Sequence, residues 1–248
     1  MAASISFDRI ADRYDETRGG EDRGRHTAEG LVPWLVPGSV LEIGVGTALV
    51  AKALLEQGYA VCGVDLSLAM LARARDRIGN RVVRADALAL PMAGGAVDNV
   101  VFVAALHAIG DTVRAVAEAA RVLRPGGRLL VAHGVPIRDD DDLEAATAGL
   151  APLREARFDT PAAVDSAAGA AGLRLVADRL TAAWNKAGDS PNQAAAGLEQ
   201  RLWSWLWDVD DATWSAVVAP AIERLRALPD PDRRRPDTGR MRLAVFER

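Results

Sequence analysis

The chain has 248 residues, of which 50% are hydrophobic and 26% are charged, and its formal net charge is −4. This length suits one α/β domain with an elaboration, and the composition is that of an ordinary globular protein. The acidic balance disfavours a nucleic-acid partner. The lack of a long apolar run and the acidic N-terminus argue against a membrane span and a signal peptide, so we expect a cytoplasmic protein.

Alternating strands and helices are predicted through the first half of the chain, after two N-terminal cap helices. Gly19 and Gly20 separate the cap helices, which we expect over residues 5–18 and 22–35. Strands are predicted over residues 39–43, 60–64, 82–85, 97–103 and 128–133, with helices over residues 47–57, 67–78 and 112–123. Because helices separate successive strands, the pattern predicts an α/β fold with a doubly wound parallel sheet.

The second half of the chain is predicted to close the sheet around a tryptophan-rich insert. A helix is expected over residues 160–171 and strands over residues 173–184 and 241–246. We therefore divide the chain into N-terminal cap helices (1–38), a core domain (39–185), a helical insert (186–238) and the last strand of the core (239–248).

Two polar segments and the tryptophans of the second half have ordinary structural interpretations. The acidic run 139–142 is expected to be a solvated loop or helix start, and residues 230–237 an exposed linker. If the segment around residues 201–208 is helical, Trp203, Trp207 and Trp214 share one face. These rings could line an aromatic substrate pocket, bury the insert or form a dimer face.

The most informative segment is a glycine turn that follows the strand 39–43. Gly44 and Gly46 allow the backbone to approach a ligand closely, and Asp65, at the end of the next strand, can accept hydrogen bonds from ribose hydroxyls. The third small residue of a dinucleotide fingerprint is missing, because Leu49 stands there. That leucine argues against a diphosphate, so the pattern indicates a nucleoside cofactor of another kind.

Several motifs, in the right order over residues 7–133, resemble those of class I S-adenosylmethionine-dependent methyltransferases. The closest resemblance is to the small-molecule branch with methyltransferase domains of types 11 and 25. Its motifs are Glu42-x-Gly44-x-Gly46-Thr47, Val64-Asp65-Leu66-Ser67-x-x-Met70-Leu71, Arg84-Ala-Asp86-Ala-x-x-Leu-Pro91, Phe102–His107, Arg121–Gly127 and Phe7-Asp8-x-x-Ala11-x-x-Tyr14-Asp15-x-x-Arg18.

The resemblance implies a seven-stranded Rossmann-like sheet of order 3-2-1-4-5-7-6, with strand 7 antiparallel and a helical lid or insert. Ala48 departs from the family, which usually has a third glycine there. Alanine should be tolerated if its φ is negative.

The resemblance also implies S-adenosylmethionine as cofactor, with S-adenosylhomocysteine as product. Asp65 would bind the ribose, Gly44 and Gly46 the methionine part, and Asp86 with the Ala87 N–H the adenine. The further cofactor-binding candidates are Tyr14, Arg18, Glu42, Leu66, Met70 and Ala104.

Three of these candidates have alternative roles. Glu42 could organise the glycine loop instead of contacting the cofactor's ammonium group. Met70 could be a core residue. Arg18 could pair with the cofactor carboxylate or form a surface salt bridge with Asp15 or Asp22.

Candidate catalytic residues come from position, since ligands bind at the carboxyl ends of strands in open α/β sheets. His107 follows the strand 97–103 and His133 ends the strand 128–133, so either could act as a base or contact the substrate. The segment Val103–His107 lacks the Asn/Asp-Pro-Pro-Tyr/Phe motif of nucleobase and amide N-methylating relatives, and no acid follows that strand as metal-dependent relatives require.

We therefore predict an enzyme that moves a methyl group to O, N or C of a small molecule, without a metal, nucleic-acid or membrane partner, as a monomer or homodimer. Three alternatives remain open: a macromolecular methyltransferase, an NAD(P)-binding oxidoreductase and a non-methylating relative that retains the cofactor site.

Overall fold

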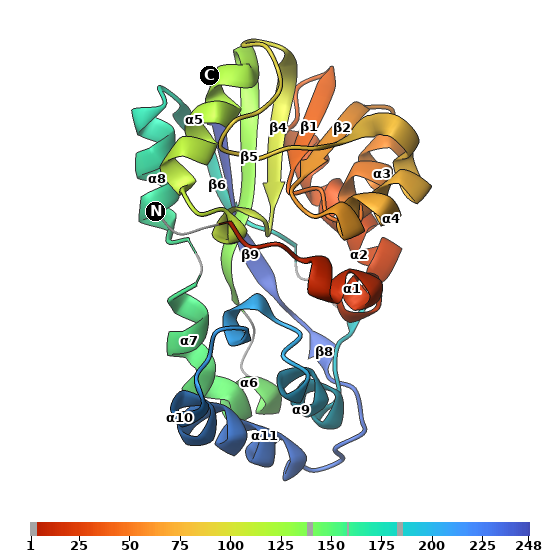
Figure 1. Cartoon of the computed structure of the whole chain (residues 1–248), viewed down its shortest axis with the longest axis vertical. Coiled ribbons are helices and arrows are strands. Elements are labelled where there is room, and N and C mark those ends of the chain that lie inside the picture. Colours follow the sequence, from red (N-terminus) through yellow and green to blue (C-terminus); the bar gives the residue numbers. More distant parts are fainter. Residues whose placement is uncertain (1–3, 138–140, 158, 183–185) are drawn as a thin grey trace. The chain divides into compact units, whose positions relative to one another are not determined.

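The computed structural model describes residues 4–137, 141–157, 159–182 and 186–248 (Figure 1). The chain forms two compact units. The first comprises residues 1–134, 159–181 and 241–248, and the second comprises residues 135–158 and 182–240. The predicted insert (186–238) falls within the second unit, and residues 135–158, which we predict as part of the core, also belong to that unit.

The first unit contains a seven-stranded sheet of order β3-β2-β1-β4-β5-β9-β6. β1 pairs in parallel with β2 and β4, whereas β9 pairs antiparallel with β6. The prediction of a doubly wound sheet in which the last strand is inserted antiparallel is therefore confirmed. The strands are β1 (Ser39–Ile43), β2 (Ala60–Asp65), β3 (Val82–Arg84), β4 (Val97–Val103), β5 (Leu123–Ile137), β6 (Arg174–Leu180) and β9 (Arg240–Glu247).

Helices cover both faces of this sheet, which explains why its central strands are mostly apolar, with Glu42, Asp98 and Asn99 as exceptions. Within β1, Val40 joins the cluster that packs under one set of helices, while Leu41 and Ile43 join the cluster on the other face. Figure 1 shows these two layers. The first consists of α2 (Gly20–Leu31), α3 (Leu49–Glu56) and α4 (Leu68–Ile78), and the second of α5 (Thr112–Val122) and α8 (Pro161–Ala170).

The N-terminal cap differs from its prediction. In place of one helix over 5–18, a 3₁₀ turn (Asp8–Arg13) leads into the single turn α1 (Tyr14–Thr17), and Gly19 and Gly20 then adopt positive φ. The second cap helix is α2, which is followed by a 3₁₀ turn over Val32–Trp34. The predicted strand 173–184 is the shorter β6, and Trp184 lies outside the described residues.

The second unit has a small helical core of its own. Leu198, Leu206, Val218 and Leu225 are buried together in it. Its elements are α6 (Asp142–Thr147), α7 (Ala151–Glu155), α9 (Pro191–Glu199), α10 (Asp211–Thr213), α11 (Ala219–Arg226) and a two-stranded ribbon of β7 (Lys186–Ala187) and β8 (Pro236–Asp237).

The helical interpretation of residues 201–208 is wrong. Within that segment a 3₁₀ turn spans Ser204–Leu206, and the tryptophan turned into the core is Trp205, which is 7% exposed. Trp205 stacks on Trp203 with ring centroids 6.1 Å apart. The arrangement of these two rings is therefore set by their stacking and not by helical spacing.

The exposed-linker interpretation of residues 230–237 is also wrong at Arg235, which is 4% exposed. Its guanidinium lies 2.6 Å from a carboxylate oxygen of Asp142 and donates to the carbonyls of Pro229 and Asp230. A guanidinium has enough donors to satisfy several acceptors at once, so a buried arginine organises this turn. In the acidic run, Asp141 caps α6, which confirms the helix-start interpretation there, whereas residues 139 and 140 lie outside the described residues.

The carboxylate of Asp98 ties the start of β4 to the start of β1. It accepts hydrogen bonds from the Ser39 backbone N–H (2.8 Å), the Ser39 hydroxyl (2.8 Å) and Arg124 (2.7 Å). The Ser39 backbone bond, then Arg124 and the Ser39 hydroxyl, lower the pKa of Asp98 to about 2. Because the charged form is bound in the folded state, this carboxylate stabilises the fold above its unfolded pKa.

We predict that Asp98→Asn lowers the free energy of unfolding at pH 7 by about 1–2 kcal/mol, the scale of hydrogen bonds to a charged acceptor. Urea denaturation from pH 7 to pH 2 measures this. The difference from the wild type should shrink as the pH falls from about 4 towards 2, because in that range the unfolded chain binds a proton at Asp98 that the folded protein does not. A difference that stays constant across that range would contradict the assignment. Asp76→Asn, on the exposed side of α4, is the control.

Candidate functional site

A pocket lies at the carboxyl ends of β1, β2 and β4 in the first unit. The empty space in it amounts to about 690 Å³, including the part open to solvent. Most predicted cofactor residues line it, namely Tyr14, Gly44, Gly46, Asp65, Leu66, Met70, Asp86, Ala87 and Ala104. Arg18, Glu42, His107 and His133 are not among its lining residues.

The glycine loop that joins β1 to α3 forms one wall of this pocket. The backbone N–H groups of Gly44 and Val45 both donate to the Val64 carbonyl, at 2.9 and 3.0 Å. Gly44 has a φ of 73°, and a Cβ atom there would lie 2.5 Å from the Cβ of Ala105. Both the turn and the approach of β4 therefore require glycine at position 44.

Asp65 connects this loop to the end of β2. Its carboxylate accepts hydrogen bonds from the Gly46 N–H (2.8 Å) and the Ser67 N–H (2.9 Å), one on each oxygen. Burial raises the pKa of Asp65, while these backbone bonds oppose the shift. Each carboxylate oxygen accepts more than one hydrogen bond, so Asp65 retains capacity for two hydroxyl donors in the pocket.

Glu42 lies on β1, just before the glycine loop, and is 3% exposed. Burial raises its pKa to about 8, and the charge of Asp65 raises it too, while a hydrogen bond from the Ala51 backbone lowers it. Ala51 is in the first turn of α3, where the N-cap residue, Ala48, has no side-chain acceptor to offer. The carboxyl of Glu42 thus serves as the missing cap, which favours its interpretation as the organiser of the glycine loop.

The condition under which alanine at position 48 would be unstrained, a negative φ, is not met. Ala48 has φ 64° and ψ 34°, the left-handed conformation in which a Cβ atom is crowded. The loop turns sharply into α3 at this point, so the backbone imposes on alanine the conformation that the family's usual glycine adopts freely.

We predict that Ala48→Gly changes the free energy of unfolding by less than about 0.5 kcal/mol, because relief of about 1 kcal/mol of strain offsets a lost buried methyl group. Ala51→Gly is the matched control, since both alanines are 0% exposed and Ala51 is helical. That control should cost about 2 kcal/mol in urea denaturation. Equal losses for the two variants would contradict the strain at Ala48.

The adenine-side candidates differ in burial. Asp86 is exposed, and its Oδ1 accepts a hydrogen bond from the Leu88 N–H at 2.9 Å, which leaves its other oxygen for a ligand. Met70 is 1% exposed and also lines the pocket, so its core and cofactor interpretations both apply. Ala104, in the left-handed conformation at φ 48°, turns the chain after β4 along the pocket wall.

The N-terminal segment contributes pocket residues that the site prediction omits, namely Ser4, Ile5 and Phe7. The Ile5 N–H donates to the Ala108 carbonyl at 2.8 Å, and the Gly110 N–H to the Ser4 hydroxyl at 3.3 Å. The rings of Phe7 and Tyr14 meet edge to face with centroids 6.4 Å apart. Phe7 belongs to the N-terminal motif, which is the one sequence signal that could have indicated it.

The Arg18 guanidinium lies over the Tyr14 ring, 5.7 Å from its centroid. Asp15 and Asp22 are the acids that the sequence offers to Arg18 as salt-bridge partners. Asp15 binds Thr47 and Arg77, and Asp22 binds Arg25.

His107 follows β4 as predicted, whereas His133 does not end its strand, because β5 continues to Ile137. His107 is in a 3₁₀ turn after β4, and burial lowers its pKa to about 4, with Asp159 opposing and Arg18 adding to the shift. His133, on β5, is 3% exposed, and its Nε2 lies 3.3 Å from Arg242 Nη1. Burial and this guanidinium lower the pKa of His133. Arg242 is in turn held by Asp165 and Asp178.

We predict that His107 is neutral at pH 7 and does not titrate near pH 6.5 in the folded protein. NMR of the imidazole nitrogens between pH 8 and pH 5, assigned with His107→Asn, measures this. Unfolding then takes up a proton, so the wild type should lose stability relative to His107→Asn as the pH falls from about 6.5 towards 4. A titration midpoint near 6.5 would contradict the burial of this ring.

Among the described residues, no group of three or more His, Cys, Asp and Glu side chains could hold a metal ion. In the same part of the chain, no helix is long and apolar enough to cross a membrane.

The segment that contributes most of this pocket is similar to known proteins. The profile of a methyltransferase domain matches residues 41–131. A demethylmenaquinone methyltransferase of Parafrankia sp. (strain EAN1pec) is 36% identical over 151 residues, which cover 50% of this chain and 59% of that protein. The chain spans less than two thirds of the length of the curated relatives it matches.

Solved structures share the fold over the whole chain. A chain in the complex between the Haloferax volcanii Trm112 methyltransferase activator and a methyltransferase superimposes with a TM-score of 0.60 at 20% identity, covering 100% of this chain and 99% of that one. The [4+2]-cyclase SpnF superimposes with a TM-score of 0.58 at 17% identity, covering 99% and 98%. At these identities the likeness shows the fold alone.

Proposed function

We propose that this chain, which contains a class I methyltransferase domain over residues 41–131, transfers a methyl group from S-adenosylmethionine to O, N or C of a small molecule. The observation that carries the proposal is the Asp65 carboxylate, which lines the pocket and holds the Gly46 N–H at 2.8 Å. A ribose needs an acceptor pair of this kind beside a closely approaching backbone.

The residues of the pocket suit each part of this cofactor. Asp65 would accept the ribose hydroxyls, Asp86 with the Ala87 N–H would take the adenine, and the loop at Gly44 and Gly46 would lie along the methionine part. Bound S-adenosylmethionine supplies a methyl group on a positively charged sulfur, which an incoming nucleophile displaces in line. The chain's own contribution is then mainly positioning, which lowers the barrier by holding the reactants in the required geometry.

His107 and His133 are the candidates for proton removal from the acceptor, although neither lines the pocket. Burial keeps His107 neutral at pH 7, but a pKa of about 4 makes its imidazole a weak base. Arg242 and burial likewise lower the pKa of His133 and weaken it as a base. An acceptor that carries an ionised oxygen would need neither residue.

The class of acceptor follows from charge and from the relatives. Nucleic-acid-binding enzymes are usually basic, whereas the net charge of this chain is −4. The charge therefore favours a small-molecule acceptor. Because relatives carry the name demethylmenaquinone methyltransferase, demethylmenaquinone is the first acceptor to assay. The profile match ends at residue 131, so those names carry over least to the second unit. We expect the enzyme to act in the cytoplasm, as a monomer or homodimer.

The second candidate is the alternative that the sequence leaves open, a relative that retains the cofactor pocket for a reaction without methyl transfer. The [4+2]-cyclase SpnF shares the fold, which at 17% identity says nothing of this chain's reaction. Incubation with S-adenosylmethionine carrying an isotopic methyl group, together with candidate acceptors, separates the two. Label in the acceptor supports methyl transfer, whereas an altered acceptor without label supports the second function.

We predict micromolar binding of S-adenosylmethionine and S-adenosylhomocysteine in calorimetric titration, and no binding of NADH. Asp65→Ala should weaken S-adenosylhomocysteine by about 1.5–3 kcal/mol, the scale of hydrogen bonds to a charged acceptor. Asp76→Ala, a carboxylate on the exposed face of α4, should leave the affinity unchanged. Tight binding of NADH alone would overturn the proposed function.

A further inference from the structure

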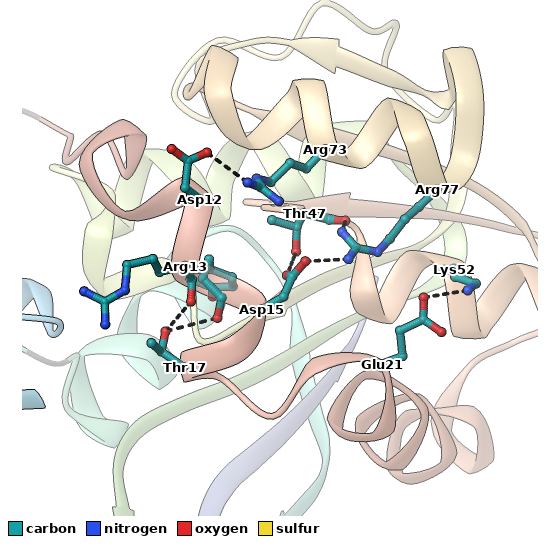
Figure 2. A network of polar contacts seen from close by, with 10 residues as sticks. Asp12, Arg13, Asp15, Thr17, Glu21, Thr47, Lys52, Arg73 and Arg77 are labelled. Carbon is teal, nitrogen blue, oxygen red and sulfur yellow. Dashed lines mark hydrogen bonds and ion pairs between the residues drawn. The ribbon is translucent and has the colours of Figure 1, made fainter. Parts of the chain in front are cut away.

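The carboxylate of Asp15, on α1, contacts the glycine loop from the N-terminal segment. Its Oδ1 accepts a hydrogen bond from the Thr47 hydroxyl at 2.6 Å, and its Oδ2 pairs with the Arg77 guanidinium. Arg77, on α4, also donates to the Thr47 carbonyl at 2.8 Å. Figure 2 shows these three side chains meeting between α1, the loop and α4. The side-chain hydroxyl and the backbone carbonyl of Thr47 are therefore both bound by residues outside the loop.

Thr47 is well placed to transmit this constraint. It is 1% exposed and lies between Gly46, whose N–H binds Asp65, and Ala48. Gly46 has a φ of 54° and Ala48 a φ of 64°, so the residues on both sides of Thr47 are left-handed. Sparsely populated backbone conformations persist when surrounding contacts over-determine them, and the bonds to Asp15 and Arg77 are such contacts.

The neighbouring acid, Asp12, provides a contrast within the same segment. It pairs with Arg73 on α4 at 2.8 Å, but its side chain is 95% exposed (Figure 2). In the ion pair of Asp15 with Arg77, the side chains are 21% and 19% exposed, so water screens that pair less. Of these two acids, Asp15 is the one that contacts the glycine loop.

We propose that Asp15 is a positioning residue for the cofactor: through Thr47 and Arg77 it holds the glycine loop in the conformation that presents Gly46 to Asp65. This inference rests on the proposed function for the identity of the ligand. It makes the N-terminal segment part of the binding machinery, because Tyr14, which lines the pocket, and Asp15, which supports the loop, are consecutive on α1.

The test compares Asp15→Asn, Thr47→Val and their double variant with Asp12→Asn. Asp15→Asn and Thr47→Val should each raise the dissociation constant of S-adenosylhomocysteine by about 5- to 30-fold, somewhat less than the full scale of a hydrogen bond to a charged group, because the effect reaches the ligand through the loop. The double variant should lose less affinity than the sum of the two single losses, because both changes weaken the bond between the Thr47 hydroxyl and Asp15, while only Asp15→Asn also removes the ion pair with Arg77. Asp12→Asn should stay within about twofold of the wild type, the scale of an exposed ion pair. Thr47→Ser, which keeps the hydroxyl, should restore binding.

Hydrogen exchange of the ligand-free protein provides a readout that is independent of the cofactor. In Asp15→Asn the backbone amides of residues 44–48 should exchange faster than in Asp12→Asn, with the rest of the first unit unchanged. Equal exchange in these two variants, or additive losses of affinity in the double variant, would overturn the proposal. Failure of every variant and of the wild type to bind S-adenosylhomocysteine would overturn the proposed function instead, while the exchange result would still decide the role of Asp15.

Discussion

The hydrogen bond from the Gly46 backbone N–H to the Asp65 carboxylate joins the carboxyl ends of β1 and β2, and the pocket depends on it. This bond orients the Asp65 carboxylate towards the pocket, and it holds the glycine loop that forms the adjacent wall. Parallel pairing of the two strands places the loop and the acid at the same edge of the sheet. A ligand that carries a diol beside a polar chain fits this arrangement. The diol would face the Asp65 carboxylate, and the polar chain would lie along the backbone of the glycine loop.

Carboxyl groups support this loop from two further directions. Glu42 supplies the cap that Ala48 does not offer to α3, and Asp15 holds Thr47. The loop therefore relies on side chains from a strand and from the N-terminal segment, in addition to its own glycines. This explains how the chain tolerates alanine at a left-handed position where a third glycine is usual: external hydrogen bonds offset a modest local strain.

The parallel sheet and the position of the pocket could be predicted from the sequence because they follow from local rules, whereas the strand order came from the resemblance to a known family. Apolar runs separated by helices indicate a parallel sheet, and glycines before an acid mark its ligand-binding edge. The φ of Ala48 could not be predicted, because the turn that imposes it depends on where α3 packs. Nor could the burial of Arg235, because its partner Asp142 is distant in the sequence and no local pattern encodes such a tertiary pairing. The stacking of Trp203 on Trp205 is a local contact, but it depends on the 3₁₀ turn Ser204–Leu206, which helical spacing does not predict.

A crystal structure with S-adenosylhomocysteine tests the central claim most directly. The account predicts the ribose hydroxyls within hydrogen-bonding distance of both Asp65 oxygens, the methionine part along Gly44 and Gly46, and an unchanged bond from Gly46 to Asp65. A ligand bound elsewhere, or a ribose turned away from Asp65, would contradict it.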